Sequence, residues 1–238
     1  IYRRHADQYE QLVSREDHLH NLLPALLEIG PFVGLTVAEL GARTGRLTKM
    51  LAPIVKYIHA FDQSPHMLDV AIDSLRGRQY LNWHASVGEH RQIPLGDGAA
   101  DIAISGWSVC YLVVENGETW EAELNKALQE MRRVVRPNGT LILIETLGTG
   151  HEEPEPPAGL VAYYEYLDGN GFQRRSVRTD YLFRDQTEAE TLTRFFFGEG
   201  MIAKLRQEEH GVVLPECTGI WWIQRDKWGR QAASGRPT

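Results

Sequence analysis

A glycine-bearing turn and two acidic residues have the types and spacing of a nucleoside-binding site. The segment VAELGARTGRLT places Glu39 two residues before Gly41, and Gly45 follows four residues after Gly41. Glycine permits positive φ and lets the backbone approach a ligand closely. A second acid, Asp62, ends the segment HAFD, and its carboxylate can accept hydrogen bonds from both hydroxyls of a ribose. The pattern therefore predicts a site for a molecule with a free ribose diol.

Both acids also have explanations that need no ligand. Asp62 could cap the helix that follows it, and Glu39 could be the solvated end of a strand. The dinucleotide fingerprint G-x-G-x-x-G is not met, because Ala42, Arg43 and Thr44 separate the two glycines. Because the turn and Asp62 occur together, we favour ribose binding at a turn unlike that of nicotinamide enzymes.

Apolar periodicity predicts the elements that would position these residues. Strands are expected over residues 35–40, 56–62, 80–86, 100–107 and 139–148. Helices are expected over residues 18–30, 45–55, 64–75 and 119–136. Strand–helix alternation with short links predicts a parallel sheet covered on both faces. The turn and Asp62 would then lie beyond the carboxyl ends of neighbouring strands, where such sheets bind ligands.

The last third of the chain has a different pattern. Residues 151–159 are rich in acid and proline and indicate a loop. Helices are expected over 160–172 and 187–209, the second with an internal break around Gly198 and Gly200. Strands are expected over 173–183 and 217–225, which could pair as an antiparallel edge of the same sheet. We expect a single domain over 31–225, a lid from 1–30 (including Tyr2 and Tyr9) and 151–172, and a flexible tail over 226–238.

Four segments resemble, in order, the successive motifs of class I S-adenosylmethionine-dependent methyltransferases of the methyltransferase type 11 group. They are VAELGARTGRLT, HAFDQSPHML, GEHRQIPLGDGAADIAISGWSVCYL and MRRVVRPNGTLILIETLG, and the resemblance covers residues 35–147. It implies a Rossmann-like α/β fold with a central, mostly parallel seven-stranded sheet and helices on both faces. The last strand would lie antiparallel beside the sixth. The resemblance also implies S-adenosylmethionine as the cofactor.

The resemblance gives each matching residue a role. Glu39 would face the amino group of the cofactor's methionine part, Asp62 would hold the ribose diol, and Glu89 would meet the adenine amino group. Met67 would cover one adenine face, although helical spacing also suits a core residue. The implied cofactor residues are Glu39, Gly41, Ala42, Arg43, Gly45, Asp62, Gln63, Met67, Glu89, His90, Ser105, Gly106 and Trp107.

Arg43 departs from the family pattern, which usually has glycine at the middle of the turn. Arginine is strained if the backbone there adopts positive φ. Its side chain could point to solvent from an ordinary backbone conformation, or turn inward and pair with the cofactor carboxylate. Loss of cofactor binding is a third outcome, which we rank lowest because Glu39 and Asp62 remain.

Methyl transfer from a sulfonium is an in-line displacement, so the protein mainly holds the two partners in line. An oxygen or nitrogen nucleophile also needs a base, for which Glu145 and His151 are candidates. Tyr111 is a third candidate catalytic residue, and Tyr163 and Tyr164 could orient the acceptor. No spacing of metal-ligating residues accompanies them, so we expect no metal.

Composition limits the partners. The 238-residue chain is 42% hydrophobic and 24% charged, which is ordinary for a globular protein. Its net charge of −7 disfavours nucleic-acid and anionic-membrane surfaces. Cys110 and Cys217 fit reduced residues better than a disulfide scaffold. No apolar run or signal-peptide pattern suggests a membrane or export, so we expect a cytoplasmic protein, either monomer or homodimer.

The leading function is transfer of a methyl group to a small-molecule acceptor. A non-catalytic S-adenosylmethionine sensor or scaffold would bind cofactor without releasing demethylated product. An NAD(P)-dependent oxidoreductase shares the sheet and the acid after the second strand, but the fingerprint turn is missing. A protein or RNA methyltransferase is less favoured, since the chain is acidic and has no added recognition module.

Overall fold

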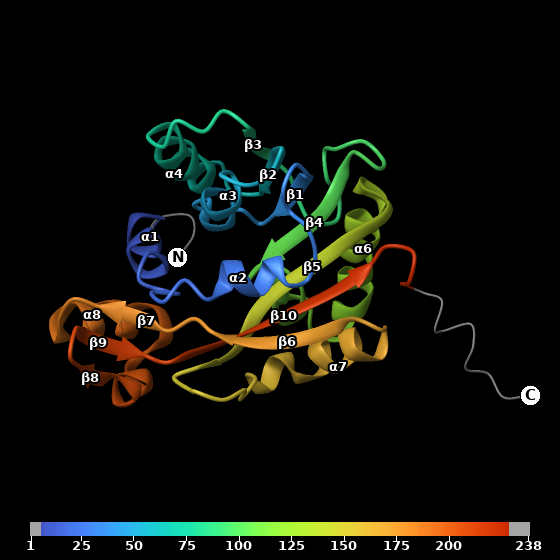
Figure 1. Ribbon diagram of the computed structural model, residues 1–238. Helices are drawn as coiled ribbons and strands as arrows, with labels where there is room; N and C mark the ends of the chain where they lie inside the picture. Colours follow the sequence, from blue (N-terminus) through green and yellow to red (C-terminus); the bar gives the residue numbers. More distant parts are fainter. Residues whose placement is uncertain (1–5, 229–238) are drawn as a thin grey trace, which may run out of the picture. The chain divides into compact units, whose positions relative to one another are not determined.

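The computed structural model describes residues 6–228. Seven strands form one sheet in the order β3-β2-β1-β4-β5-β10-β6, and three form a second sheet in the order β7-β9-β8 (Figure 1). In the larger sheet β1 is parallel to β2 and β4, β2 to β3, and β4 to β5. The expected Rossmann-like α/β fold, with a mostly parallel sheet of seven strands, is confirmed.

The bounds of the elements follow the predicted alternation. The strands of the larger sheet are β1 Thr36–Leu40, β2 Tyr57–Asp62, β3 Trp83–Val87, β4 Ala100–Gly106, β5 Val135–Thr149, β6 Gln173–Arg178 and β10 Glu216–Gln224. Those of the smaller sheet are β7 Tyr181–Phe183, β8 Arg206–Glu208 and β9 Gly211–Leu214. The helices are α1 Ala6–Val13, α2 Leu22–Leu27, α3 Arg46–Leu51, α4 Pro65–Arg76, α5 Cys110–Glu115, α6 Trp120–Val134, α7 Val161–Gly169 and α8 Gln186–Phe197.

The order of the strands reverses between β1 and β4, and the region beyond the carboxyl ends of these two strands is called the crevice below. The chain builds β1, β2 and β3 in one direction across the sheet, and β4 then returns to the other side of β1. Such a reversal leaves room beyond the carboxyl ends of the two strands, where open α/β sheets bind ligands. The turn after β1 and the loop after β4 therefore border the same crevice.

Helices cover both faces of this sheet, as the side-chain alternation of its strands shows. Glu39 on β1 pairs in register with Ile104, and Ile104 with Ile142, so these side chains share one face. The Glu39 carboxylate meets Thr48 of α3 on that face. Glu145, three residues beyond Ile142, points to the other face and meets α5 and α7. The two acids therefore contact helices on opposite faces of the sheet.

The helix predicted over residues 18–30 is shorter than expected, because its start is set by Asp17. The Asp17 carboxylate accepts hydrogen bonds from the backbone N–H groups of Asn21 and Leu22, at 2.8 and 3.2 Å. His20 has φ +57°, which is incompatible with a helix. The helix therefore begins only at Leu22.

The segment predicted as a helix over 187–209 is a helix followed by a hairpin. Helix α8 ends at Gly198, whose φ of +85° stops the helix, and a 3-10 helix follows over Glu199–Lys204. Strands β8 and β9 then pair antiparallel, and β9 pairs with β7. The strand predicted over 173–183 is likewise two strands, β6 and β7, in different sheets.

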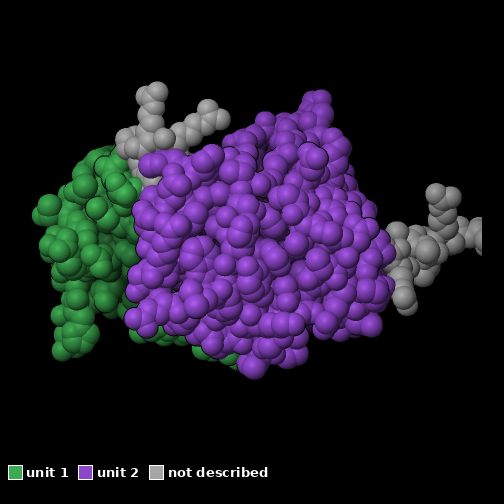
Figure 2. Space-filling view, turned by 90° about the horizontal axis from the view of Figure 1, so that it is seen from above, with its two compact units in different colours: residues 1–30, 146–157, 176–219 green, residues 31–145, 158–175, 220–238 purple. Residues whose placement is uncertain are grey.

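The chain divides into two compact units, coloured separately in Figure 2. Unit 1 contains Ile1–Gly30, Thr146–Pro157 and Ser176–Gly219; unit 2 contains Pro31–Glu145, Ala158–Arg175 and Ile220–Thr238. The domain bounds and the lid expected from sequence stay predictions. Tyr2 and residues 229–238 of the expected tail lie outside the described residues.

Each unit has its own apolar core. The core of unit 1 is built by Leu12, Tyr181, Phe183, Ala189, Leu192, Val212 and Leu214. In unit 2 every residue of β4 is buried, and Trp221 is fully buried with its ring stacked on Tyr164 at 4.5 Å. None of the helices within residues 6–228 has the length and apolarity to cross a bilayer.

Candidate cofactor site

The turn between β1 and α3 needs glycine for steric reasons. Gly41 has φ +71° and Gly45 has φ +78°, both in the left-handed region. A Cβ atom on Gly41 would lie 1.9 Å from the Ser108 hydroxyl oxygen, so no larger residue fits. The N–H groups of Gly41 and Ala42 both donate to the Phe61 carbonyl, at 2.8 and 2.9 Å, which ties the turn to β2.

Asp62 holds the turn after β1 and the turn after β2 together. Its carboxylate is buried and accepts one hydrogen bond at each oxygen, from the N–H of Arg43 and from that of Ser64, both at 2.8 Å. The Ser64 hydroxyl, not Asp62, accepts from Met67 N and caps α4. A carboxylate has about four acceptor positions, so Asp62 retains capacity for a diol.

Glu39 is a buried acid, not the solvated end of a strand. Its side chain is 1% exposed and accepts a hydrogen bond from the Thr48 hydroxyl. The pKa of Glu39 is raised to about 8, because burial, aided by the negative charge of Asp62, outweighs the lowering effect of the Thr48 hydrogen bond. Glu39 is therefore mostly protonated at neutral pH in this structure.

The opposite wall of the crevice is the end of β4. The Ser105 hydroxyl is fully buried and has no hydrogen-bond partner among the described residues. At Gly106 a Cβ atom would approach Leu47 of α3 to 2.9 Å. Trp107 follows with φ +48°, and its N–H donates to the Ile144 carbonyl at 2.6 Å.

The residues expected around adenine differ in their surroundings. Met67 is 1% exposed, as the core interpretation requires, whereas Gln63 is exposed. The Glu89 carboxylate pairs with Arg91, which also pairs with Glu123 on α6. Because Arg91 already neutralises Glu89, contact between Glu89 and adenine stays a prediction.

His90 is not merely exposed, because its ring reaches back to the loop after β4. Its Nε2 atom lies 2.9 Å from the Ser108 hydroxyl oxygen, next to Gly41. Desolvation, together with the positive charges of Arg43 and Arg91, lowers the pKa of His90 to about 4. His90 is therefore neutral at physiological pH. Ser108 was not predicted from sequence, where a lone serine after Trp107 carried no signal.

Arg43 keeps the left-handed backbone that glycine would supply, with φ +51°. Its guanidinium donates to the Trp107 carbonyl oxygen and lies 5.1 Å from the centroid of the Tyr111 ring. The side chain is half-buried. The interpretation in which Arg43 points to solvent from an ordinary backbone conformation is therefore wrong, and the side chain faces the loop after β4.

Glu145 is the centre of a buried polar cluster in unit 2. Its Oε1 accepts hydrogen bonds from the Cys110 N–H at 3.0 Å and from the Tyr163 hydroxyl at 3.3 Å. Its Oε2 is buried without a partner among the described residues. Burial raises the pKa of Glu145 to about 7, although these hydrogen bonds and the charge of Arg43 lower it. Cys110 and Tyr163 thus join Glu145, whereas Tyr111 is exposed.

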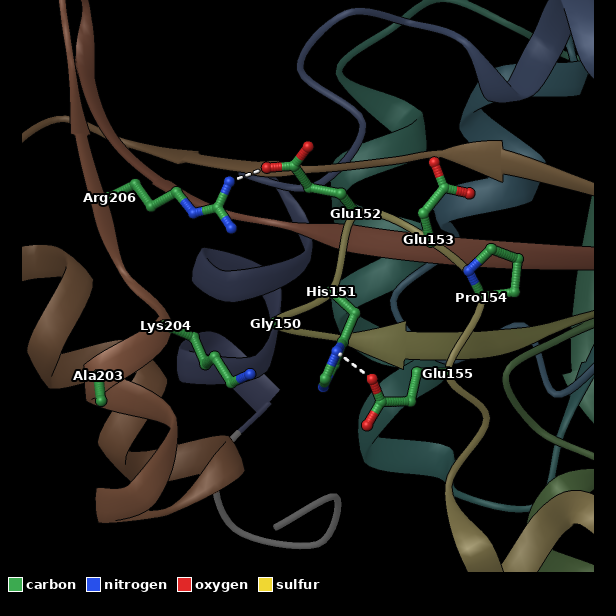
Figure 3. Close-up of a pocket in the computed structure, with 9 residues that line it drawn as sticks. All are labelled: Gly150, His151, Glu152, Glu153, Pro154, Glu155, Ala203, Lys204 and Arg206. Carbon is green, nitrogen blue, oxygen red and sulfur yellow. Dashed lines mark ion pairs between the residues drawn. The ribbon is translucent and has the colours of Figure 1, made fainter.

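His151 lies in unit 1, in the loop that follows β5. Its Nδ1 atom is 2.8 Å from a carboxylate oxygen of Glu155. It lines a cavity of about 370 Å³ with neighbouring loop residues and with Lys204 and Arg206, and the Arg206 guanidinium pairs with Glu152 there (Figure 3). The sequence predicts a loop here and gives His151 as a candidate base, and the structure adds this charged cavity around it.

The raised pKa of Glu145 gives a pH-dependent stability. A carboxyl group whose pKa rises from about 4.5 in the unfolded chain to about 7 on folding loses its stabilising contribution as pH increases through that range. Glu145→Gln mimics the protonated group and does not titrate. As pH rises from 4.5 to 8, its free energy of unfolding should therefore increase by about 2–3 kcal/mol relative to that of the wild type.

Urea unfolding at pH 4.5, 6 and 8 measures this difference. The exposed Glu118→Gln supplies the matched control, and its free energy of unfolding should track that of the wild type. Parallel pH profiles for Glu145→Gln and wild type would contradict a buried, protonated Glu145.

The crevice belongs to a known type of domain. Residues 38–143, which carry the glycine turn, Asp62 and the end of β4, match the model of a family described as methyltransferase domain. The segment 38–143 is a methyltransferase domain. S-adenosylmethionine is the cofactor that domains of this class use.

Curated relatives share this methyltransferase domain. Uncharacterized protein YafE of Escherichia coli is 33% identical over 111 residues, which cover 47% of this chain and 49% of YafE. The malonyl-[acyl-carrier protein] O-methyltransferase of Serratia marcescens is 37% identical over 117 residues, 49% of this chain and 40% of that enzyme. The chain spans about half or less of the length of these relatives.

Solved structures share the fold of the methyltransferase domain over most of the chain. The YcgJ protein of Bacillus subtilis aligns with a TM-score of 0.60 at 14% identity, covering 87% of this chain and 99% of that one. A SAM-dependent methyltransferase from Aquifex aeolicus aligns with a TM-score of 0.54 at 19% identity, covering 84% and 87%. At such identities the likeness shows the fold alone.

The residues of the methyltransferase domain fit its cofactor chemically. Asp62 has acceptor positions left for a ribose diol, and the Ser105 hydroxyl is buried and unsatisfied near the strand end. Gly41 allows the turn after β1 to pack closely against Ser108 in the loop after β4. The neutral His90 adds a polar group without adding charge.

Proposed function

We propose that this protein transfers a methyl group from S-adenosylmethionine to a small-molecule acceptor. The observation that carries the proposal is the position of Asp62. Its buried carboxylate joins the turns after β1 and β2 at a strand-order reversal and retains capacity for a diol. This is the placement that a nucleoside sugar needs in an open α/β sheet.

The chain's own residues would position the cofactor in distinct ways. Asp62 would hold the ribose, and the backbone at Gly41 and Gly45 would run against the methionine part. Glu39, at the end of β1 just before the turn, would face the cofactor's amino group once it is deprotonated. The bound cofactor supplies an electrophilic methyl group, so the remaining task of the protein is to orient an acceptor and accept its proton.

Glu145 is the residue best suited to take that proton. Its pKa of about 7 matches what a general base needs near neutral pH, and its Oε2 has no partner among the described residues. Tyr163 and the Cys110 N–H hold the other oxygen and fix the orientation of the carboxylate. His151 and Tyr111 remain second candidates.

A small molecule is the acceptor class that the charge favours. The net charge of −7 opposes a nucleic-acid acceptor. Among the relatives, malonyl-[acyl-carrier protein] O-methyltransferase of Serratia marcescens methylates oxygen and UbiE of Rubrivivax gelatinosus is a C-methyltransferase, 26% identical over 115 residues. The proposal therefore names the donor and the acceptor class, not the attacked atom.

Titration calorimetry with S-adenosylmethionine and S-adenosylhomocysteine tests the donor, and a mass-spectrometric screen of metabolites for one added methyl group tests the acceptor. We expect a dissociation constant in the low micromolar range, which corresponds to a binding free energy of about −8 kcal/mol. Glu145→Gln should bind cofactor normally and lose methylated product. Binding without product from any metabolite extract would favour a sensor, and heat with NADPH alone would favour an oxidoreductase.

A further inference from the structure

Arg43 spans the crevice between the turn after β1 and the loop after β4. Its main-chain N–H donates to Asp62, and its guanidinium donates to the Trp107 carbonyl oxygen. The two loops follow β1 and β4, the strands between which the strand order reverses. Arg43 thus brings its side chain to the place where the proposed cofactor would lie.

Both ends of this link have unusual backbone conformations. Arg43 and Trp107 are non-glycine residues with φ of +51° and +48°. Left-handed backbone at such residues is costly and persists where surrounding contacts hold it. At Trp107 those contacts are the N–H bond to Ile144 and the carbonyl bond to Arg43; at Arg43 they include the bond to Asp62. The arginine side chain is therefore held in place at the crevice.

The link also places a permanent positive charge among the groups of the site. A guanidinium cannot lose its proton in a protein. The charge of Arg43 reaches both walls, since it lowers the pKa of His90 beside the glycine turn and that of Glu145 on β5. It also occupies the Trp107 carbonyl, a partial negative charge that a cationic ligand could otherwise approach.

We propose that Arg43 determines cofactor specificity by disfavouring the sulfonium donor relative to its demethylated product. The inference rests on the proposed function. The two cofactor forms share the ribose, the adenine and the amino-acid part, and differ by one methyl group and one positive charge. A fixed guanidinium in the same crevice repels the charged sulfur of the donor and not the neutral thioether. Arg43 thus favours retention of the product, where family members with glycine have no such charge.

Calorimetric titrations with both cofactor forms test this through the ratio of their dissociation constants, donor over product. Arg43→Gln should lower the ratio about fivefold or more, the scale for two unit charges partly screened by solvent. Arg43→Lys, which keeps a charge, should stay near the wild-type ratio. A change that alters the binding of both cofactor forms equally, such as loss of a contact with the carboxylate of their amino-acid part, cancels in the ratio.

Two further variants complete the comparison. Arg76→Gln removes an exposed arginine of α4 and should leave the ratio unchanged. Arg43→Gly accepts the left-handed backbone without strain, so it should fold even if Arg43→Gln does not, and should lower the ratio alike.

The outcomes separate this inference from the proposed function. A ratio within twofold of wild type in both Arg43→Gln and Arg43→Gly would overturn the role of Arg43 while leaving methyl transfer standing. Failure of the wild-type protein to bind either cofactor form would overturn the proposed function, and this inference with it.

Discussion

Gly41→Ala is expected to destabilise the protein by about 3 kcal/mol or more and to abolish cofactor binding. The added Cβ atom would lie 1.9 Å from the Ser108 hydroxyl oxygen and 2.4 Å from the Ser108 Cβ atom, far inside contact distance. Alanine is also strained at the φ of +71° that Gly41 adopts. Chemical unfolding measures the loss of stability, and titration calorimetry at low temperature measures the loss of binding.

Two companion variants make the cause specific. Gly96→Ala adds a methyl group at an exposed glycine with open space around its Cβ position, and should change stability by less than about 1 kcal/mol. Ser108→Gly removes both clashing atoms, so the double variant Gly41→Ala/Ser108→Gly should recover part of the loss. If Gly41→Ala were as stable as Gly96→Ala, the close packing of the two loops would be wrong.

Asp62→Ala is expected to weaken S-adenosylmethionine binding by about 100-fold or more. The change removes the acceptor for the ribose and leaves the N–H groups of Arg43 and Ser64 without their partner. Each unsatisfied buried group costs about 1–3 kcal/mol, so the free energy of unfolding should fall as well. Calorimetry and urea unfolding separate the two effects.

Asp62→Asn refines this test, because its amide keeps one acceptor oxygen. Its loss of affinity should lie between those of wild type and Asp62→Ala. Asp69→Ala, an exposed acid on α4, is the control for the removal of one negative charge and should bind cofactor as the wild type does. Unchanged affinity in Asp62→Ala would exclude Asp62 from the cofactor site.

The methyltransferase half of the fold could be predicted because its signals are local. Strands β1, β2 and β4 are short, mostly apolar runs between turns, and α4 begins with Ser64 and Pro65 at their preferred positions. Alternation of strands and helices then leaves few possible topologies. The glycine turn and Asp62 could be placed at one edge of the sheet for the same reason.

The hairpin of β8 and β9 could not be predicted, because its sequence suits a helix as well. The three residues of β8, Arg206 to Glu208, are charged or amide-bearing and fully exposed, so no apolar alternation marks them. Gly198, read as a break inside one helix, ends α8 altogether. Pairing with β9 and β7, which is a tertiary contact, decides the conformation.

The sequence indicated which residues belong to the site better than it indicated their protonation states and backbone conformations. Types and order along the chain indicated Glu39, Asp62 and Glu145, but protonation depends on burial that a sequence does not display. The raised pKa of Glu39 and Glu145 and the lowered pKa of His90 all come first from desolvation. The left-handed backbone of Arg43 is held by Asp62 and Trp107, from two other segments.

The interleaving of the two units restricts how this chain can change by recombination. Each unit is assembled from three separate stretches, so the polypeptide passes between units at five positions, after Gly30, Glu145, Pro157, Arg175 and Gly219. The family match over residues 38–143 falls wholly within one stretch, Pro31–Glu145. That stretch could be inherited or exchanged as a continuous module. Unit 1 is spread over three stretches, so exchanging it as a whole would require three separate replacements.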